Sequence, residues 1–276
     1  MSHFLVMVIG NDPEKQLEKY DESIEVDPYV IEIGESTKTR MINWCAREYN
    51  FKGTFEECCE KYSKDWNEDY KKEPLTGRWV EVSTYNPNSK YDYYELGGRW
   101  GGFITALKNK PNISANQALF GDIDTEAIIK QKANLALADY RKIASLFDNN
   151  IIPKVDVKWL DLWKQLRGEK KRIDILDIYN SQPAVKLAHE KIKETSVHFD
   201  IDNYQMTEEE YVKYHTRDLF SVFAVVKDGK WYDSGTMGWF GMSSNNKPEE
   251  EWSKEVKDLM KDLSDDTLIS FYDCHI

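Results

Sequence analysis

Two histidines near the ends of the chain are candidates for acid–base chemistry. His3 begins a predicted strand and His275 ends one, so antiparallel pairing of these strands would place both imidazoles at one end of a sheet. Asp273 is two residues before His275, and both side chains therefore point to one face. Two imidazoles and a carboxylate could bind a divalent metal ion, or act as acid and base on a phosphodiester. His3, Asp273 and His275 are the candidate catalytic residues, although histidines near chain ends are often solvated or hydrogen-bonded locally.

Glycines and tryptophans gather in two short stretches, residues 97–102 and 229–241. Glycine lets a backbone approach a ligand closely, and tryptophan offers a flat face for stacking. Arg99 could bind a phosphate in bidentate fashion, and Lys90 could add a positive charge. The stretches thus suit a planar, phosphate-bearing small molecule. The alternative is that the glycines form bulges and turns while the tryptophans fill the core. The candidate ligand-binding residues are Lys90, Tyr94, Gly97, Gly98, Arg99, Trp100, Trp231 and Trp239.

The spacing of these residues excludes several common sites. Residues 97–102 lack the G-x-G-x-x-G spacing of a dinucleotide fingerprint, and no Gly-Lys-Ser/Thr follows them. A nucleophile elbow is also absent from the sequence. Asp122 and Asp124 could ligate a cation, but Asp124 is also well placed to cap the helix predicted behind it.

The elements that would position these residues are strands near both chain ends and helices between them. Residues 4–9 form a continuous apolar run typical of a buried strand, and Asp228-Gly229 is a hairpin turn. The predicted fold is a single α+β domain over 1–276, with 124–218 as a helical insertion. Its mixed, mainly antiparallel sheet contains the first and last strands. Helices are predicted over 55–72, 124–147, 156–167, 183–194 and 248–262.

Charge limits the partners of the protein. The chain has 276 residues and a formal net charge of −12, from 37 Lys and Arg against 49 Asp and Glu. Such acidity disfavours long nucleic acids and anionic membranes. It does not disfavour a small anionic nucleotide, because residues 86–103 hold two basic and two acidic side chains. The early apolar run is too short to span a membrane. Four cysteines without a C-x-x-C pair predict reduced thiols and a cytoplasmic location.

Several stretches form a set that extends over both chain ends and the glycine-rich centre. They are residues 1–4, 8–10, 86–94, 97–100, 121–124, 223–232, 237–239 and 273–276. As a set they resemble a family of accessory proteins encoded by bacteriophages and related mobile elements. The resemblance implies a viral protein that works in the bacterial host cytoplasm, in host takeover or counter-defence. It supplies no catalytic residues.

Two functions remain open. The first is a counter-defence protein that binds a small nucleotide signal and sequesters or hydrolyses it, as a phosphodiesterase-type hydrolase with or without a divalent metal ion. The alternative is an acidic protein–protein inhibitor that occludes a host defence protein. A DNA mimic fits less well because lysines are interleaved with the acids. Whether the protein forms a homo-oligomer stays open.

Overall fold

The computed structural model describes residues 2–65, 69–102, 104, 114, 116–192, 201–238 and 241–276. The chain divides into two compact units. Unit 1 comprises residues 1–100, 222–249 and 269–276, and unit 2 comprises residues 101–221 and 250–268. Among the helices of the described ranges, none is long and apolar enough to cross a membrane. The single-domain organisation stays a prediction.

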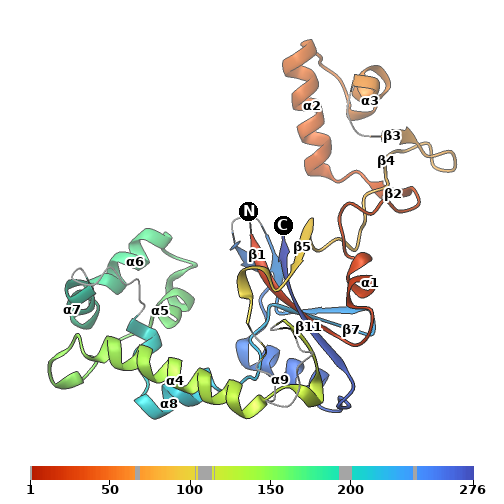
Figure 1. The fold of residues 1–276 in the computed structure, drawn as a ribbon. Helices are drawn as coiled ribbons and strands as arrows, with labels where there is room; N and C mark the ends of the chain where they lie inside the picture. Colours follow the sequence, from red (N-terminus) through yellow and green to blue (C-terminus); the bar gives the residue numbers. More distant parts are fainter. Residues whose placement is uncertain are drawn as a thin grey trace. The chain divides into compact units, whose positions relative to one another are not determined.

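The central sheet of unit 1 contains both terminal strands (Figure 1). Its strands lie in the order β5 (Tyr93–Leu96), β11 (Leu268–His275), β1 (His3–Ile9), β7 (Ala224–Lys227) and β8 (Lys230–Asp233). β1 is parallel to β7, and the other neighbouring pairs of this series are antiparallel. The α+β class and the mixed, mainly antiparallel sheet are therefore confirmed.

β1 is buried on both faces, as its continuous apolar run predicts. On one face, Phe4, Val6 and Val8 pack with Leu17 of α1 (Pro13–Glu18) in one core cluster. The turn between β7 and β8 has Asp228 at φ 51° and Gly229 at φ 65°, the pair of positive φ angles that a type I′ hairpin needs.

A smaller sheet in unit 1 has the strand order β2–β4–β3. The predicted helix over 55–72 is wrong beyond Tyr62, because Tyr70 lies in β3 and pairs with Glu81 of β4. The aromatic spacing of this stretch suits a helix, but long-range strand pairing decides the structure. Trp66 lies outside the described residues. The elements here are β2 (Tyr29–Glu32), α2 (Glu35–Tyr49), α3 (Phe55–Tyr62), a 3-10 turn (Ser63–Asp65), β3 (Asp69–Lys72) and β4 (Trp79–Ser83), and the unit also holds β9 (Thr236–Met237) and β10 (Ser243–Ser244).

A disulfide joins Cys45 of α2 to Cys58 of α3. The prediction of four reduced thiols is wrong for this pair, because packing of α2 on α3 brings together two cysteines whose spacing carries no sequence signal. Cys59 and Cys274 are free and buried. Burial raises the pKa of the Cys59 thiol to about 12.

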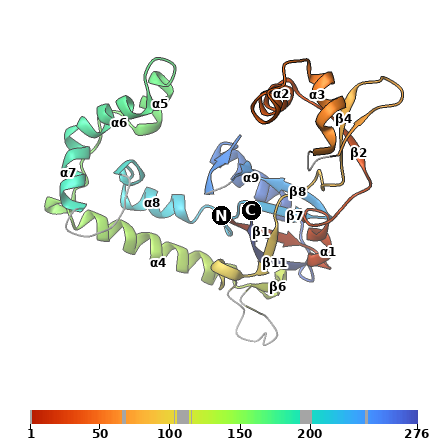
Figure 2. The ribbon, with the colours of Figure 1, turned by 90° about the horizontal axis from the view of Figure 1, so that it is seen from above.

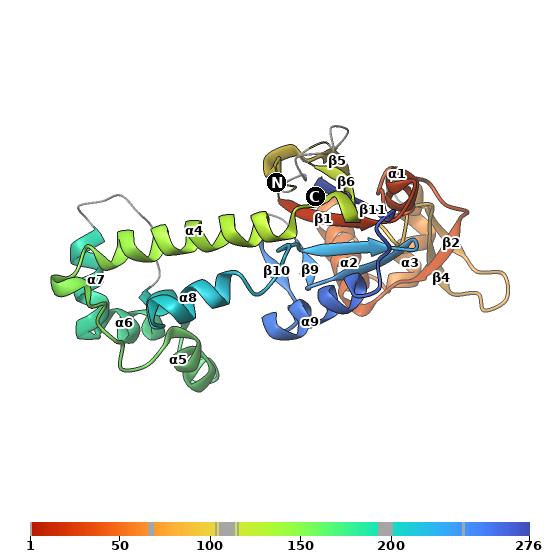
Figure 3. The same ribbon diagram turned by 60° about the horizontal axis from the view of Figure 1, so that its bottom comes forward.

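Unit 2 is built around α4, with α8 beside it and α5, α6 and α7 gathered near its C-terminal half (Figures 2 and 3). Asp124 caps α4 by accepting from the backbone N–H of Ala127 at 2.9 Å, so the capping alternative holds for this residue. The helices of this unit are α4 (Thr125–Ala144), α5 (Trp159–Leu166), α6 (Arg172–Ser181), α7 (Pro183–Ile192), α8 (Glu208–His215) and α9 (Glu249–Met260, from Glu250 on). They are accompanied by β6 (Gln117–Leu119) and three 3-10 turns (Phe120–Asp122, Asp148–Asn150 and Ile201–Tyr204).

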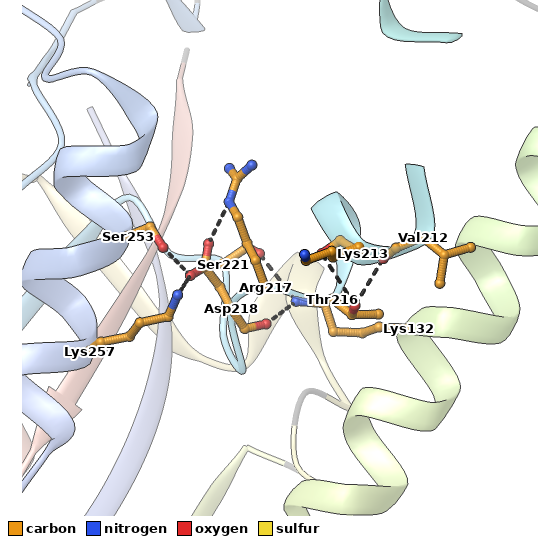
Figure 4. Close-up of polar contacts among 9 residues, drawn as sticks. All are labelled: Lys132, Val212, Lys213, Thr216, Arg217, Asp218, Ser221, Ser253 and Lys257. Carbon is orange, nitrogen blue, oxygen red and sulfur yellow. Dashed lines mark hydrogen bonds and ion pairs between the residues drawn. The ribbon is translucent and has the colours of Figure 1, made fainter. Parts of the chain in front are cut away.

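Polar contacts around Asp218 tie three elements of unit 2 together (Figure 4). The Asp218 carboxylate accepts from the Ser253 hydroxyl of α9, and Nζ of Lys257 lies 3.3 Å from it. Nζ of Lys132 in α4 donates to the Asp218 backbone carbonyl at 2.6 Å. Burial lowers the pKa of Lys132, and the negative charge of Asp218 opposes this shift.

Candidate functional site

The two terminal histidines meet at one end of the central sheet of unit 1. His3 of β1 lies directly opposite His275 of β11 in the antiparallel register. Their ring centroids are 4.8 Å apart, and the rings lie edge to face at 68°. The juxtaposition that the sequence predicts is therefore present.

Each histidine is bonded through Nδ1 to its own carboxylate. Nδ1 of His3 lies 2.8 Å from Oδ1 of Asp273, and Nδ1 of His275 lies 2.6 Å from Oδ1 of Asp92. Because an ionised carboxylate can only accept, Nδ1–H is the donor in both pairs, and Nε2 is then the ring nitrogen left for proton exchange. We call these the two His–Asp pairs. Their side chains are 19% (His3), 5% (Asp273), 14% (His275) and 37% (Asp92) exposed.

The buried carboxylate of Asp273 is held by the glycine-rich loop after β5. The backbone N–H of Arg99 donates to Oδ2 of Asp273 at 3.0 Å. Gly98 has φ +46°, and a Cβ added there would lie 2.6 Å from the same Oδ2. The backbone N–H of Gly97 donates to the carbonyl of Phe271 at 2.8 Å, which fixes the loop against β11. Gly98 thus has a specific role, since only glycine lets the backbone come this close to the carboxylate.

Asp92 is a residue of this site that the sequence alone does not indicate. Its backbone N–H donates to the carbonyl of His275 at 2.9 Å, so the chain holds its side chain beside that ring. Tyr93, the next residue, lies opposite His275 in the β5–β11 register and is 59% exposed. The sequence offers no local signal for Asp92, because its partner is distant in the chain and depends on the pairing of β5 with β11.

Two of the predicted ligand-binding aromatics lie on the other face of the sheet. Tyr94 is opposite Cys274, and its ring contacts Tyr272 at a centroid distance of 5.4 Å. Trp231 packs against Tyr20 at 5.0 Å, and its indole N–H donates to Asp233 at 3.0 Å. Both therefore face the apolar core cluster of unit 1 rather than the histidines.

The remaining predicted ligand-binding residues lie in two different places. Lys90 forms an ion pair with Asp233, with Nζ 3.6 Å from Oδ2. Gly97, Gly98, Arg99 and Trp100 belong to the loop at Asp273, where the Arg99 side chain is exposed and Trp100 is half-buried.

Trp239 lies outside the described residues. The residues that flank this segment are anchored at Ser2, beside His3. The Ser2 hydroxyl donates to the carbonyl of Gly238 at 2.7 Å and accepts from the N–H of Gly241. Ser2 therefore ties this part of the chain to the strand end that carries His3.

A metal site is not evident at the two His–Asp pairs. In the described ranges, no three or more His, Cys, Asp or Glu side chains are grouped so that they could hold a metal ion. The Nδ1 atoms of both histidines are already bonded to carboxylates. What the arrangement offers directly is two oriented imidazoles, which is the equipment of general acid–base catalysis.

No protein-family model matches the chain, and neither a curated protein nor a solved structure does so. The resemblance to phage accessory proteins stays a prediction, and the chemistry of the site rests on its own geometry.

Proposed function

We propose that the protein binds a small nucleotide signal and hydrolyses its phosphodiester bond by general acid–base catalysis at the two His–Asp pairs. The observation that carries the proposal is the contact between two imidazoles that are each oriented through Nδ1 by a carboxylate. A lone histidine could take or give a proton, but two adjacent ones can do both in a single step.

The proposed reaction is a hydrolysis. Nε2 of one neutral imidazole takes a proton from water, whose oxygen forms a new bond to phosphorus. The phosphorus–oxygen bond to the leaving nucleoside breaks as the second, protonated imidazole gives its Nε2 proton to the leaving oxygen. Each carboxylate stabilises the imidazolium form of its own histidine. Exchange of protons with solvent restores the starting state.

Groups beside the histidines support an anionic, base-bearing substrate. The exposed guanidinium of Arg99 lies in the loop that holds Asp273, and it could pair with phosphate oxygens. The exposed ring of Tyr93, next to Asp92, offers a face for stacking a base. The resemblance to phage accessory proteins favours removal of a host signalling nucleotide as the biological role.

The test is incubation of the protein with cyclic and linear nucleotides, with divalent metal ions or with a chelator, followed by chromatography. The proposal expects new products whose formation depends on His3 and His275. Unchanged nucleotide that reappears only after heat denaturation would instead mean sequestration without hydrolysis. If no nucleotide is depleted, the proposal fails and inhibition of a host protein becomes the better account.

A further inference from the structure

A strip of exposed basic side chains lies in unit 2, in an otherwise acidic protein. Residues 162–172 contain five basic residues and one acidic residue. We call the set Lys164, Arg167, Lys170, Lys171 and Arg172 the basic strip. All five side chains are exposed, and in the part of the chain that the structure describes none of them has an acidic side chain within ion-pair distance.

Apolar side chains flank the basic strip. Leu160 is 57% exposed and Ile173 is 58% exposed. A hollow of about 510 Å³ lies beside Lys164, and its charged lining consists of two lysines and two aspartates, Lys158, Lys164, Asp156 and Asp161. Exposed aliphatic groups bordered by charged side chains are compatible with the apolar centre and polar rim of a protein-binding surface.

The aromatic side chains near the basic strip pack against the interior of unit 2. Trp159 and Trp163 are half-buried and pack against the core of unit 2, where Trp159 contacts Tyr179 at a centroid distance of 5.7 Å. They are thus not available as a stacking platform for nucleic acid bases, and the apolar face of α5 is not free to enter a lipid surface. A protein partner is therefore favoured.

Unit 1 carries a surface of the opposite charge. Residues 20–37 contain six acidic residues and no basic one. Glu25, Asp27 and Glu32 are exposed, and we call these three the acidic strip. It is flanked by Val30, which is 53% exposed on the edge strand β2. A backbone bond from Val26 N–H to the carbonyl of Thr84, 3.0 Å long, anchors this stretch.

We propose that the basic strip of one copy of this chain docks on the acidic strip of a second copy. Each surface has the charge that the other lacks, and each adds exposed aliphatic groups that would be buried on contact. Because the two surfaces differ, the contact is heterologous and runs head to tail. The net charge of −12 does not forbid it, because at physiological salt charges are screened beyond about 8 Å.

Sedimentation velocity of the full chain over a range of concentrations, at about 50 mM and about 500 mM salt, tests this docking. The parent protein should associate at low salt and dissociate at high salt. Lys170→Glu/Lys171→Glu and Glu25→Lys/Asp27→Lys should each weaken self-association at least about tenfold. An equimolar mixture of these two variants should associate again, because their reversed surfaces are complementary.

The matched control is Lys130→Glu/Lys142→Glu, which reverses two exposed lysines of α4 in the same unit and should associate like the parent. Circular dichroism checks that every variant is folded. A parent protein that stays monomeric at every concentration and salt overturns the proposal, even if it binds an added acidic peptide or oligonucleotide. A mixture of the two reversed variants that stays monomeric also overturns it.

Discussion

The imidazole rings of His3 and His275 touch edge to face, although the two residues stand at opposite ends of the sequence. The antiparallel pairing of β1 with β11 brings them together. Each ring is bonded through Nδ1 to a different carboxylate. Two imidazoles that are oriented in this way and in contact with each other can address one substrate from adjacent positions.

Asp92 is expected to act as a positioning residue through His275. Asp92→Asn should lower kcat about 10–100-fold with little change in KM, because the amide no longer stabilises the imidazolium. The measurement is a double-mutant cycle with His275→Ala, in which Asp92→Asn should cost nothing further once the imidazole is gone. Additive losses, or an effect confined to KM, would show that Asp92 acts elsewhere.

Gly98→Ala is expected to destabilise the fold by about 1–3 kcal/mol, because the new methyl group would collide with Asp273 at a backbone angle that alanine disfavours. Gly77→Ala is the matched control, since Gly77 also has a positive φ, +69°, but a Cβ there meets nothing within 4 Å. Urea unfolding of both variants provides the comparison. Equal stability of the two would mean that the loop does not need to approach Asp273 so closely.

The histidine pair could be predicted from the sequence because both of its strands are apolar runs at identifiable ends of the chain. The partner Asp92 could not, because the register of β5 against β11 is a long-range property. The strand register also decides which tyrosine of β5 lies beside the histidines. Tyr93 lies on the face of the histidines and Tyr94 on the opposite face, and the sequence alone does not distinguish them. Likewise Tyr70 has helical spacing from Tyr62 but pairs as a strand residue.

Thiol counting checks the disulfide and the burial of the other two cysteines. The native protein should resist alkylation at neutral pH, because Cys59 and Cys274 are buried and burial raises the pKa of both thiols. Unfolding without reductant should expose two thiols, and unfolding with reductant four, as read by mass spectrometry. Labelling of four thiols without reductant would contradict the Cys45–Cys58 bond.

Stability should fall as the pH rises above about 9. Burial raises the pKa of Cys59 from 9.0 to about 12 and that of Tyr204 from 10.0 to about 12. Over this window the unfolded chain loses these protons while the folded chain keeps them, so deprotonation favours unfolding. The pKa of Lys132 is lowered in the folded state, so this group alone would make the protein more stable as the pH rises. It is outweighed by the buried thiol and phenol groups, whose pKa values are raised. Urea midpoints measured from neutral to alkaline pH should decrease, and a constant midpoint would contradict the burial of these groups.

The most direct test of the central claim is the rate of nucleotide hydrolysis by His3→Ala, His275→Ala and the parent protein under identical conditions. The two His–Asp pairs predict that each substitution lowers turnover at least about 100-fold while circular dichroism shows an intact fold. The control variant His189→Ala, which removes an exposed histidine of α7, should keep full turnover. Full turnover in His275→Ala would contradict the account.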